Sequence, residues 1–275
     1  GNGGYTEAIL KAADCKVIAI DRDPTVLPRT EELKALYGSR FEFRRGQFSD
    51  IKALINQPVN GVVFDIGVSS MQLDQAERGF SFSKDAPLDM RMDREQPLTA
   101  YDVVNKYDER EIANILFDYG EEKLARVIAR NIVAKRAQKP IETTLELAKI
   151  VEDSYPAKTR WKFGHPAKRT FQAIRIAVNG ELNALDEAIT AMARRLKKGG
   201  RMAVITFHSL EDRIVKSAFR ELNLACTCPP DFPVCVCGKV QEVELVNKKP
   251  IVASEEELQN NPRSQSAKLR IVERL

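Results

Sequence analysis

The sequence predicts an α/β protein in which a mostly parallel sheet is interrupted by an all-helical segment. Three observations lead to this fold class. Strand-like and helix-like patterns alternate from residue 1 to 68, as in parallel sheets. From residue 98 to 168 the apolar spacing is helical throughout, and from residue 169 the alternation resumes. We therefore predict a core of residues 1–97 and 169–275, and an inserted helical domain of residues 98–168.

The elements before the insertion follow from periodicity and turn residues. The glycine-rich loop GNGG precedes the helical pattern YTEAILKAA, and the short β-branched run CKVIAIDRD predicts a strand that ends in acidic residues. Pro24 suits the start of a second helix. That helix is PTVLPRTEELKALY, and it is followed by the strand FEFRRG and by the buried strand and small-residue loop VNGVVFDIGVSS.

Periodicity also predicts the elements of the insertion and of the C-terminal part of the chain. Helices are predicted in the insertion over AYDVVNKYDEREIANILFDYG, EEKLARVIARNIVAKRAQ and TTLELAKIVEDSY. After it, the apolar spacing of residues 169–198 predicts one long amphipathic helix. The strand GGRMAVITF and the helix HSLEDRIVKSAFREL follow. Two closing strands are expected in EVELVNKKP and KLRIVERL, separated by the polar stretch SEEELQNNPRSQS.

Composition and charge limit the function classes. With 43% hydrophobic and 30% charged residues, the 275-residue chain has the composition of a globular protein. The longest apolar runs fall far short of the ~18 residues that cross a bilayer, so no membrane span is expected. The net charge is only +4, but residues 123–169 hold 12 basic and 4 acidic side chains. Such a block suits either phosphate binding, which predicts that the inserted domain of residues 98–168 binds RNA, or a solvated helix face.

The five cysteines point to a reducing, cytoplasmic location, because four of them crowd into CTCPPDFPVCVCG rather than forming a framework of disulfides. Cys226, Cys228, Cys235 and Cys237 form two C-x-C pairs. Four thiolates can close a zinc site, but structural zinc sites more often use C-x2-C pairs. We favour a reduced loop at the edge of the sheet and predict no metal, with zinc as the alternative.

A glycine loop, a helix and an acidic residue at the tip of the next strand form the usual cradle for a nucleoside-bearing cofactor. Here the loop contains Gly3 and Gly4, and the acidic residue is Asp21. Dinucleotides and S-adenosylmethionine both suit this pattern. Asp65 ends a later strand, where open α/β sheets hold reacting groups, and Phe48 follows another strand. With these residues the pattern favours S-adenosylmethionine.

Seven motifs between residues 21 and 216 resemble the MraW family, and the resemblance runs from residue 1 to the C-terminus. They are DRDP, DIGVSSMQLD, ERGFSF, PLDMRMD, YGEEKLA, RTFQAIRI and FHSLEDRIVK. The resemblance implies a class I (Rossmann-like) methyltransferase core with an inserted helical domain. It also implies transfer of a methyl group from S-adenosylmethionine to the exocyclic N4 amine of a cytidine in small-subunit ribosomal RNA. The family has a further strand just before the glycine loop, which is missing from this chain.

The resemblance also implies a set of cofactor contacts. By position in the motifs they fall on Gly3, Gly4, Tyr5, Asp21, Phe48, Asp65 and Gln72. The family usually has His where this chain has Tyr5.

The chemistry suggests further candidates. The lone pair of a cytosine amine is delocalised, so a nearby acceptor must take up its proton. Asp65, Ser69 and Ser70 are the nearest such groups in the sequence. Arg169 and Arg175 are candidates for binding phosphates. Trp161 and Phe163 lie among basic residues and suit either the stacking of an unpaired base or packing in the core. His208 and Ser209 follow a strand and either contact the substrate or cap the next helix.

Two other functions stay open at this point. DNA amino methyltransferases usually carry Asn or Asp followed by Pro-Pro and an aromatic residue, where this chain has DIGVSS. A catalytically weak RNA-binding or ribosome-assembly factor with the same fold is the alternative from a different class. Either ribosomal RNA or the small ribosomal subunit is the expected partner, and the sequence does not predict an oligomeric state.

Overall fold

The computed structural model describes residues 1–158, 160–162, 164–229 and 234–275. The chain divides into two compact units, and each contains two separate stretches of sequence. The first unit consists of residues 1–45 and 68–181, and the second of residues 46–67 and 182–275. Within the described residues, no helix is both long and apolar enough to span a bilayer.

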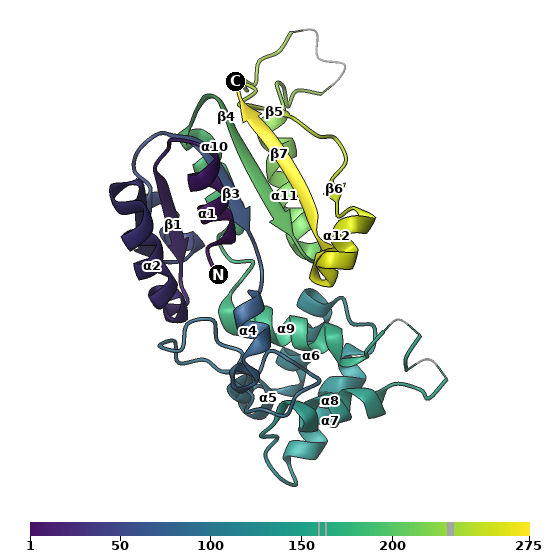
Figure 1. Cartoon of the computed structure of the whole chain (residues 1–275). Coiled ribbons are helices and arrows are strands. Elements are labelled where there is room, and N and C mark those ends of the chain that lie inside the picture. Colours follow the sequence, from purple (N-terminus) through teal and green to yellow (C-terminus); the bar gives the residue numbers. More distant parts are fainter. Residues whose placement is uncertain (159, 163, 230–233) are drawn as a thin grey trace. The chain divides into compact units, whose positions relative to one another are not determined.

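The first unit begins with a small α/β part. Strands β1 (Val17–Asp21) and β2 (Phe41–Arg45) pair in parallel, with Val17 opposite Phe41. The connecting segment includes the 3-10 turn η1 (Pro24–Val26), helix α2 (Leu27–Tyr37) and the 3-10 turn η2 (Gly38–Arg40). Helix α1 (Gly4–Ala12) precedes β1 (Figure 1). Leu10, Leu33 and Phe41 form the core of this part. The strands and helices predicted for residues 4–45 are confirmed.

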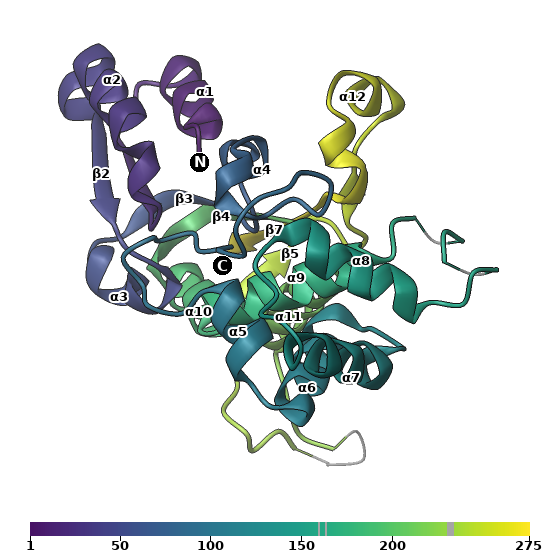
Figure 2. The same ribbon diagram turned by 90° about the horizontal axis from the view of Figure 1, so that it is seen from below.

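Residues 100–179 of this unit are mainly helical, as predicted for residues 98–168, and Figure 2 shows α5 to α9 near one another. A single buried core runs through it, including Ile112, Leu116, Ile128 and Ile174. The single helix predicted over AYDVVNKYDEREIANILFDYG is two helices, α5 and α6. They are separate because the side chain of Asp108 caps the start of α6. The predicted boundaries of the inserted domain remain a prediction. The elements are α4 (Ser70–Asp74), the 3-10 turn η4 (Ala76–Arg78), α5 (Ala100–Lys106), α6 (Glu109–Gly120), α7 (Ala125–Arg136), α8 (Thr144–Ser154) and α9 (Ala167–Asn179).

The second unit is built on a five-stranded sheet. Its strands are β3 (Val59–Asp65), β4 (Leu196–Thr206), β5 (Val243–Leu245), β6 (Ile251–Val252) and β7 (Lys268–Arg274), in the order β3-β4-β7-β5 with β6 beside β7. Helices α10 (Leu185–Arg195) and α11 (Ser209–Asn223) pack against the sheet (Figure 1). Shorter elements are the 3-10 turn η3 (Phe48–Asp50), α3 (Ile51–Leu54), α12 (Glu255–Asn260) and the 3-10 turn η5 (Pro262–Ser266).

The structure corrects three further details of the predicted fold. The larger sheet is mixed rather than mostly parallel, because β3 and β4 are parallel but β7 runs antiparallel to its neighbours. The single helix predicted over residues 169–198 is α9 and α10. It breaks at Gly180, whose left-handed backbone (φ 57) ends α9. The polar stretch before β7 contains α12, which Ser254 caps.

Candidate active site

The glycine loop and the end of β1 lie side by side in the first unit. The amino group of Gly1 contacts Asp21 Oδ2. A Cβ atom on Gly1 would lie 3.6 Å from the Cβ of Ser69. The other oxygen of Asp21, Oδ1, accepts the backbone N–H of Asp23 at 2.9 Å. The structure thus brings together the loop, the acidic residue and a serine that the sequence predicted from three separate segments.

The backbone of this loop requires glycine at position 3 but not at position 4. Gly3 caps α1 in a left-handed conformation (φ 74), and a Cβ there would lie only 2.9 Å from Leu33 Cδ1. At Gly4, by contrast, a Cβ would meet no described atom within 4 Å. Tyr5 is 51% exposed. Helix N-termini in general carry a partial positive charge that favours anions and polar ligands.

Gln72 lies in a buried polar network rather than with its amide free for a ligand. Its Nε2 donates to Asp23 Oδ2 at 2.7 Å, and its Oε1 accepts the backbone N–H of Ser69 at 2.9 Å. Arg78, 1% exposed, donates to the same oxygen of Asp23 at 2.9 Å. Burial alone would raise the pKa of Asp23. Hydrogen bonds from Gln72, Thr25 and Arg78 outweigh it and hold that pKa below its ordinary value.

Sequence reasoning missed Asp23 and Arg78 as site-building residues, although DRDP and ERGFSF contain them. Asp23 follows Asp21 by two positions and holds the turn after β1, where it also accepts the N–H of Thr25 at 3.0 Å. The network therefore fixes the segment that carries Asp21. Gln72 thus holds Asp23, two residues from Asp21, and its contact with the cofactor remains a prediction.

The two candidate serines begin a short helix. Ser69 Oγ accepts the backbone N–H of Gln72 at 3.3 Å and, together with the return bond from Gln72, forms a capping box for α4. Ser70 is exposed at the first position of that helix. The contacts of Ser69 are those of a helix cap, which favours a structural role for this residue.

Arg169 and Arg175 both lie on α9, as the sequence predicted, but their side chains are engaged. Arg169 Nη1 donates to the carbonyl of Glu121 at 3.1 Å. Arg175 forms a two-pronged ion pair with Glu181, at 2.8 and 2.9 Å, and only 14% of its side chain is exposed. Of the two, the exposed Arg169 is the better placed to meet a phosphate.

Trp161 belongs to a small aromatic cluster. The ring of His165 stacks on Phe82 at 4.3 Å between centroids and meets the Trp161 ring edge-on at 5.1 Å. Trp161 is 57% exposed, so one side of the cluster stays accessible. Phe163, the other predicted stacking residue, lies outside the described residues.

In the second unit, Asp65 ends β3 beside β4, as predicted. The next residue, Ile66, donates its N–H to Ile205 of β4 at 3.1 Å. Burial raises the pKa of the Asp65 carboxyl, and the negative charge of Glu211 raises it further, although the residue keeps an exposed surface. Phe48 meets Phe64 of the same strand edge-on, with ring centroids 5.8 Å apart.

His208 is the N-cap of α11, one of the two roles that the sequence left open. Its Nδ1 accepts the backbone N–H of Glu211 at 3.4 Å. Its Nε2 lies 3.1 Å from Glu211 Oε1. Ser209 is exposed in the first turn.

Sequence reasoning also missed Glu211 as a site residue, although the motif FHSLEDR contains it. Its carboxylate is fully buried and accepts the N–H groups of Phe207 and His208 at 2.8 and 3.2 Å. Gly67 (φ 103) turns the chain after β3 so closely that a Cβ there would lie 3.5 Å from Glu211 Oε1. The end of β3 and the start of α11 therefore bring two acidic side chains near each other, the exposed Asp65 and the buried Glu211.

Comparison with known proteins finds relatives that match this chain over its whole length. Residues 1–275 match the MraW methylase family. A protein of Heliobacterium modesticaldum called ribosomal RNA small subunit methyltransferase H is 51% identical over 282 residues, covering 100% of this chain and 90% of the relative. Proteins of the same name from Carboxydothermus hydrogenoformans and Paenibacillus sp. are 50% and 51% identical, again over 100% of this chain and 89% and 91% of the relatives.

Proposed function

Because this chain belongs to the MraW methylase family, and its full-length relatives are small-subunit ribosomal RNA methyltransferases, we propose that it methylates the exocyclic N4 amine of a cytidine in that RNA. The proposed methyl donor is S-adenosylmethionine. The observation that carries the proposal is the arrangement at the strand ends. β1 ends in Asp21 against the glycine loop, and β3 ends in Asp65 near Glu211.

The residues of the first unit fit the nucleoside part of this donor. Asp21 offers a carboxylate to ribose hydroxyls, and the open space at Gly4 lets a ligand approach the backbone at the start of α1. In the second unit, Phe48 offers an aromatic surface for a base beside Phe64. When bound, S-adenosylmethionine supplies a methyl group already activated by the positive charge on its sulfur.

Asp65 is the strongest of the three candidate proton acceptors. Its raised pKa brings the carboxylate closer to the basicity that a general base needs near neutral pH. A hydrogen bond from the amine N–H to this carboxylate would localise the nitrogen lone pair. The carboxylate would then accept the proton that the amine loses on methylation. Glu211 supports this role as a positioning residue, because its charge raises the pKa of Asp65 and its backbone hydrogen bonds fix the loop beside it.

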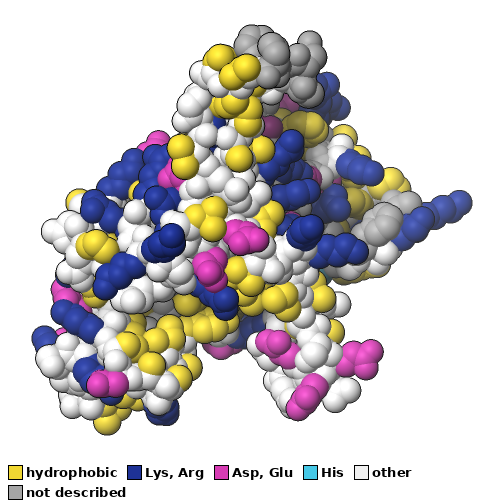
Figure 3. Space-filling view, turned by 90° about the horizontal axis from the view of Figure 1, so that it is seen from above, with side chains coloured by type: hydrophobic (Ala, Val, Ile, Leu, Met, Phe, Trp, Pro, Cys, Tyr) yellow, Lys and Arg dark blue, Asp and Glu magenta, His cyan; other side chains and the backbone are white. Residues whose placement is uncertain are grey.

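The proposed RNA surface lies on α6 and α7. A hollow of about 620 Å³ there is lined by Phe117, Lys123 and Arg126 among others. Phe117 is 67% exposed. Arg130 and Lys135 are exposed further along α7, and in the described structure none of these four cations forms an ion pair. In the view of Figure 3, Lys and Arg side chains lie scattered among uncharged and hydrophobic ones, so exposed cations alone do not mark an RNA surface. Exposed cations beside an aromatic ring suit phosphates and an unpaired base.

Single-turnover methylation with saturating S-adenosylmethionine and small ribosomal subunits tests the proposal. Digestion of the RNA to nucleosides followed by mass spectrometry should give N4-methylcytidine. Asp65→Asn should slow the reaction by about 10²-fold or more, the range of general base catalysis. Asp14→Asn, at a fully exposed side chain, should leave it unchanged. Methyl transfer to another atom, or equal rates for the two variants, would contradict the assignment.

The same measurements separate an enzyme from a binding protein. Retained RNA binding without cofactor binding or methyl transfer would identify a ribosome-assembly factor instead. Ribosomal RNA or the small subunit is the proposed partner, and the cytoplasm, where that substrate is found, is the proposed location.

A further inference from the structure

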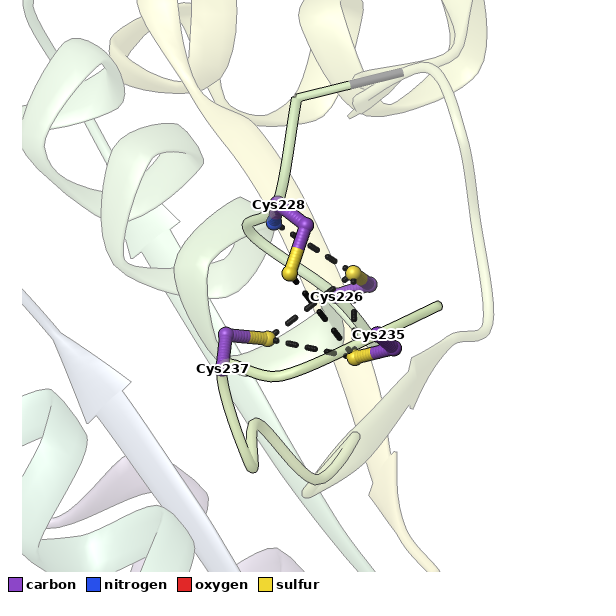
Figure 4. A group of neighbouring side chains, drawn as sticks. All are labelled: Cys226, Cys228, Cys235 and Cys237. Carbon is purple, nitrogen blue, oxygen red and sulfur yellow. Dashed lines mark hydrogen bonds between the residues drawn. The ribbon is translucent and has the colours of Figure 1, made fainter. Parts of the chain in front are cut away.

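Four cysteines converge in the loop that joins α11 to β5. Figure 4 shows the sulfur atoms of Cys226, Cys228, Cys235 and Cys237 pointing toward one another. Cys226 Sγ lies 3.4 Å from Cys235 Sγ and 3.8 Å from Cys237 Sγ. Cys235 Sγ lies 3.5 Å from Cys237 Sγ and 4.0 Å from Cys228 Sγ. All four sulfurs lie within 4.8 Å of one another, so both C-x-C pairs direct their side chains inward.

These separations are those of a tetrahedron around a single ion. With zinc–sulfur bonds of about 2.3 Å, the sulfurs of a tetrahedral site lie roughly 3.8 Å apart. The four separations quoted above lie on either side of this value. They are much longer than the about 2.05 Å of a disulfide bond, and all four cysteines are free thiols.

The loop has little apolar burial to hold the sulfurs together. Cys226, Cys235 and Cys237 are exposed, and so are the neighbouring Val234 and Val236, at 68% and 72%. Free thiols are weak hydrogen-bond donors, so contacts among four of them contribute little against the entropy of ordering the loop. A bound ion would supply the missing stabilisation.

Backbone N–H groups of the same loop point at the sulfurs. Cys228 N–H donates to Cys226 Sγ at 3.3 Å, and Val236 N–H donates to Cys228 Sγ at 3.4 Å. Thr227 N–H donates to Cys237 Sγ, also at 3.4 Å. Such donors offset part of the negative charge of thiolate ligands and orient them, as outer-shell groups do around metal ions.

We propose that Cys226, Cys228, Cys235 and Cys237 bind one Zn²⁺ ion as a closed, structural site. Four thiolates select soft, tetrahedral metals, and the compact set fits a single ion. Binding releases four thiol protons and places one zinc among four sulfurs. Because the protein fills all four positions, none remains for water or substrate.

The position of the loop in the second unit agrees with a structural role. It enters β5 at Val243, opposite Arg274 at the end of β7. Glu273, the preceding residue of β7, pairs with Arg201 in the first half of β4, whereas Asp65 pairs with Ile205 near the end of β4. The cysteines therefore lie toward the end of this sheet opposite to Asp65. We expect zinc to hold the loop and β5 without contributing to methyl transfer.

Metal analysis of the full chain tests the proposal. The untagged protein is purified in reducing buffer without chelator, incubated with ZnCl2 and desalted. We expect one zinc per chain, retained in Cys15→Ser and lost in the double variant Cys226→Ser with Cys235→Ser. In the parent chain, titration with a mercurial reagent should release that zinc as four thiols react, which makes the test independent of variant folding. Cobalt substitution should give the absorption of a tetrahedral tetrathiolate site.

Three results would overturn the proposal. The first is a zinc content below about a tenth per chain after incubation, with all five thiols immediately reactive. The second is iron in place of zinc after reconstitution with both metals. The third is disulfide bonding among the four cysteines in protein purified under reducing conditions.

Discussion

Gln72 donates its side-chain amide N–H to the buried carboxylate of Asp23 over 2.7 Å, so that the residue expected to touch the cofactor also holds the turn after β1. Gln72→Ala should lower the free energy of unfolding by about 1–3 kcal/mol, because Asp23 and the Ser69 N–H lose a buried partner. Denaturant unfolding measures this loss. Gln138→Ala, at an exposed position after α7, is the control and should change little.

If Gln72 positions the turn after β1, Gln72→Ala should also change cofactor binding. Cofactor affinity should fall together with stability, because Asp21 lies two residues from Asp23. If affinity falls while stability stays at the parent value, Gln72 acts on the cofactor directly and not through Asp23.

Asp21→Ala should weaken S-adenosylmethionine binding by about 1–3 kcal/mol, because the ribose hydroxyls lose a charged acceptor. Isothermal titration calorimetry gives the affinity directly. Asp14→Ala removes a carboxylate beyond the end of α1 whose side chain is fully exposed, and it should bind like the parent chain. An Asp21 variant with parent affinity would remove this residue from the cofactor site.

Reversing two exposed charges on α7, with Arg130→Glu and Lys135→Glu, should weaken RNA binding and flatten its dependence on salt. Affinity for a small-subunit RNA fragment is measured across a salt series, and cofactor affinity should not change. The pair Lys34→Glu and Lys248→Glu changes the net charge equally at exposed positions elsewhere. If both double variants bind RNA alike, α7 presents only a solvated face.

Asp102 predicts a pH dependence of stability. Lys106 and the cap residue Thr99 lower its pKa from 3.8 to about 2. A lowered pKa in the folded state stabilises the fold above the unfolded pKa, and this contribution disappears as the pH falls from about 4 to about 2. Asp102→Asn should therefore melt at a lower temperature than the parent at pH 6, and the difference should shrink toward pH 2. A constant difference across this range would show that the ionised carboxylate does not stabilise α5.

The sequence predicted the elements whose signals are local. The β-branched runs at β1 and β4 and the amphipathic spacing of α11 fixed their type and approximate ends, and the motifs placed Asp21 and Asp65 at strand ends. Gly180 was missed as a helix end because the apolar spacing continues on both sides of it, and only its left-handed backbone shows the break. The antiparallel entry of β7 depends on long-range pairing, which periodicity does not encode.

The site residues that the sequence missed depend on contacts between distant segments or within one turn. Arg78 meets Asp23 from 55 positions away, and no spacing rule links the two. Glu211 resembles an ordinary capping-box residue in the sequence, and only the backbone of Gly67 beside it shows that it neighbours the end of β3. The cysteines were evident as a cluster, but their inward convergence required coordinates.

The division of the first unit into two stretches of chain constrains its biosynthesis. Arg22, just after β1, donates to the carbonyl of Asn179 at 2.7 Å, and these residues are 157 positions apart. On a translating ribosome this hydrogen bond cannot form until the end of α9 has left the exit tunnel. The segment with Asp21 must therefore wait for most of the chain before it reaches its final form. A stalled or truncated product that ends before α9 would expose this segment to chaperones and proteases, however well its own helices and strands had folded.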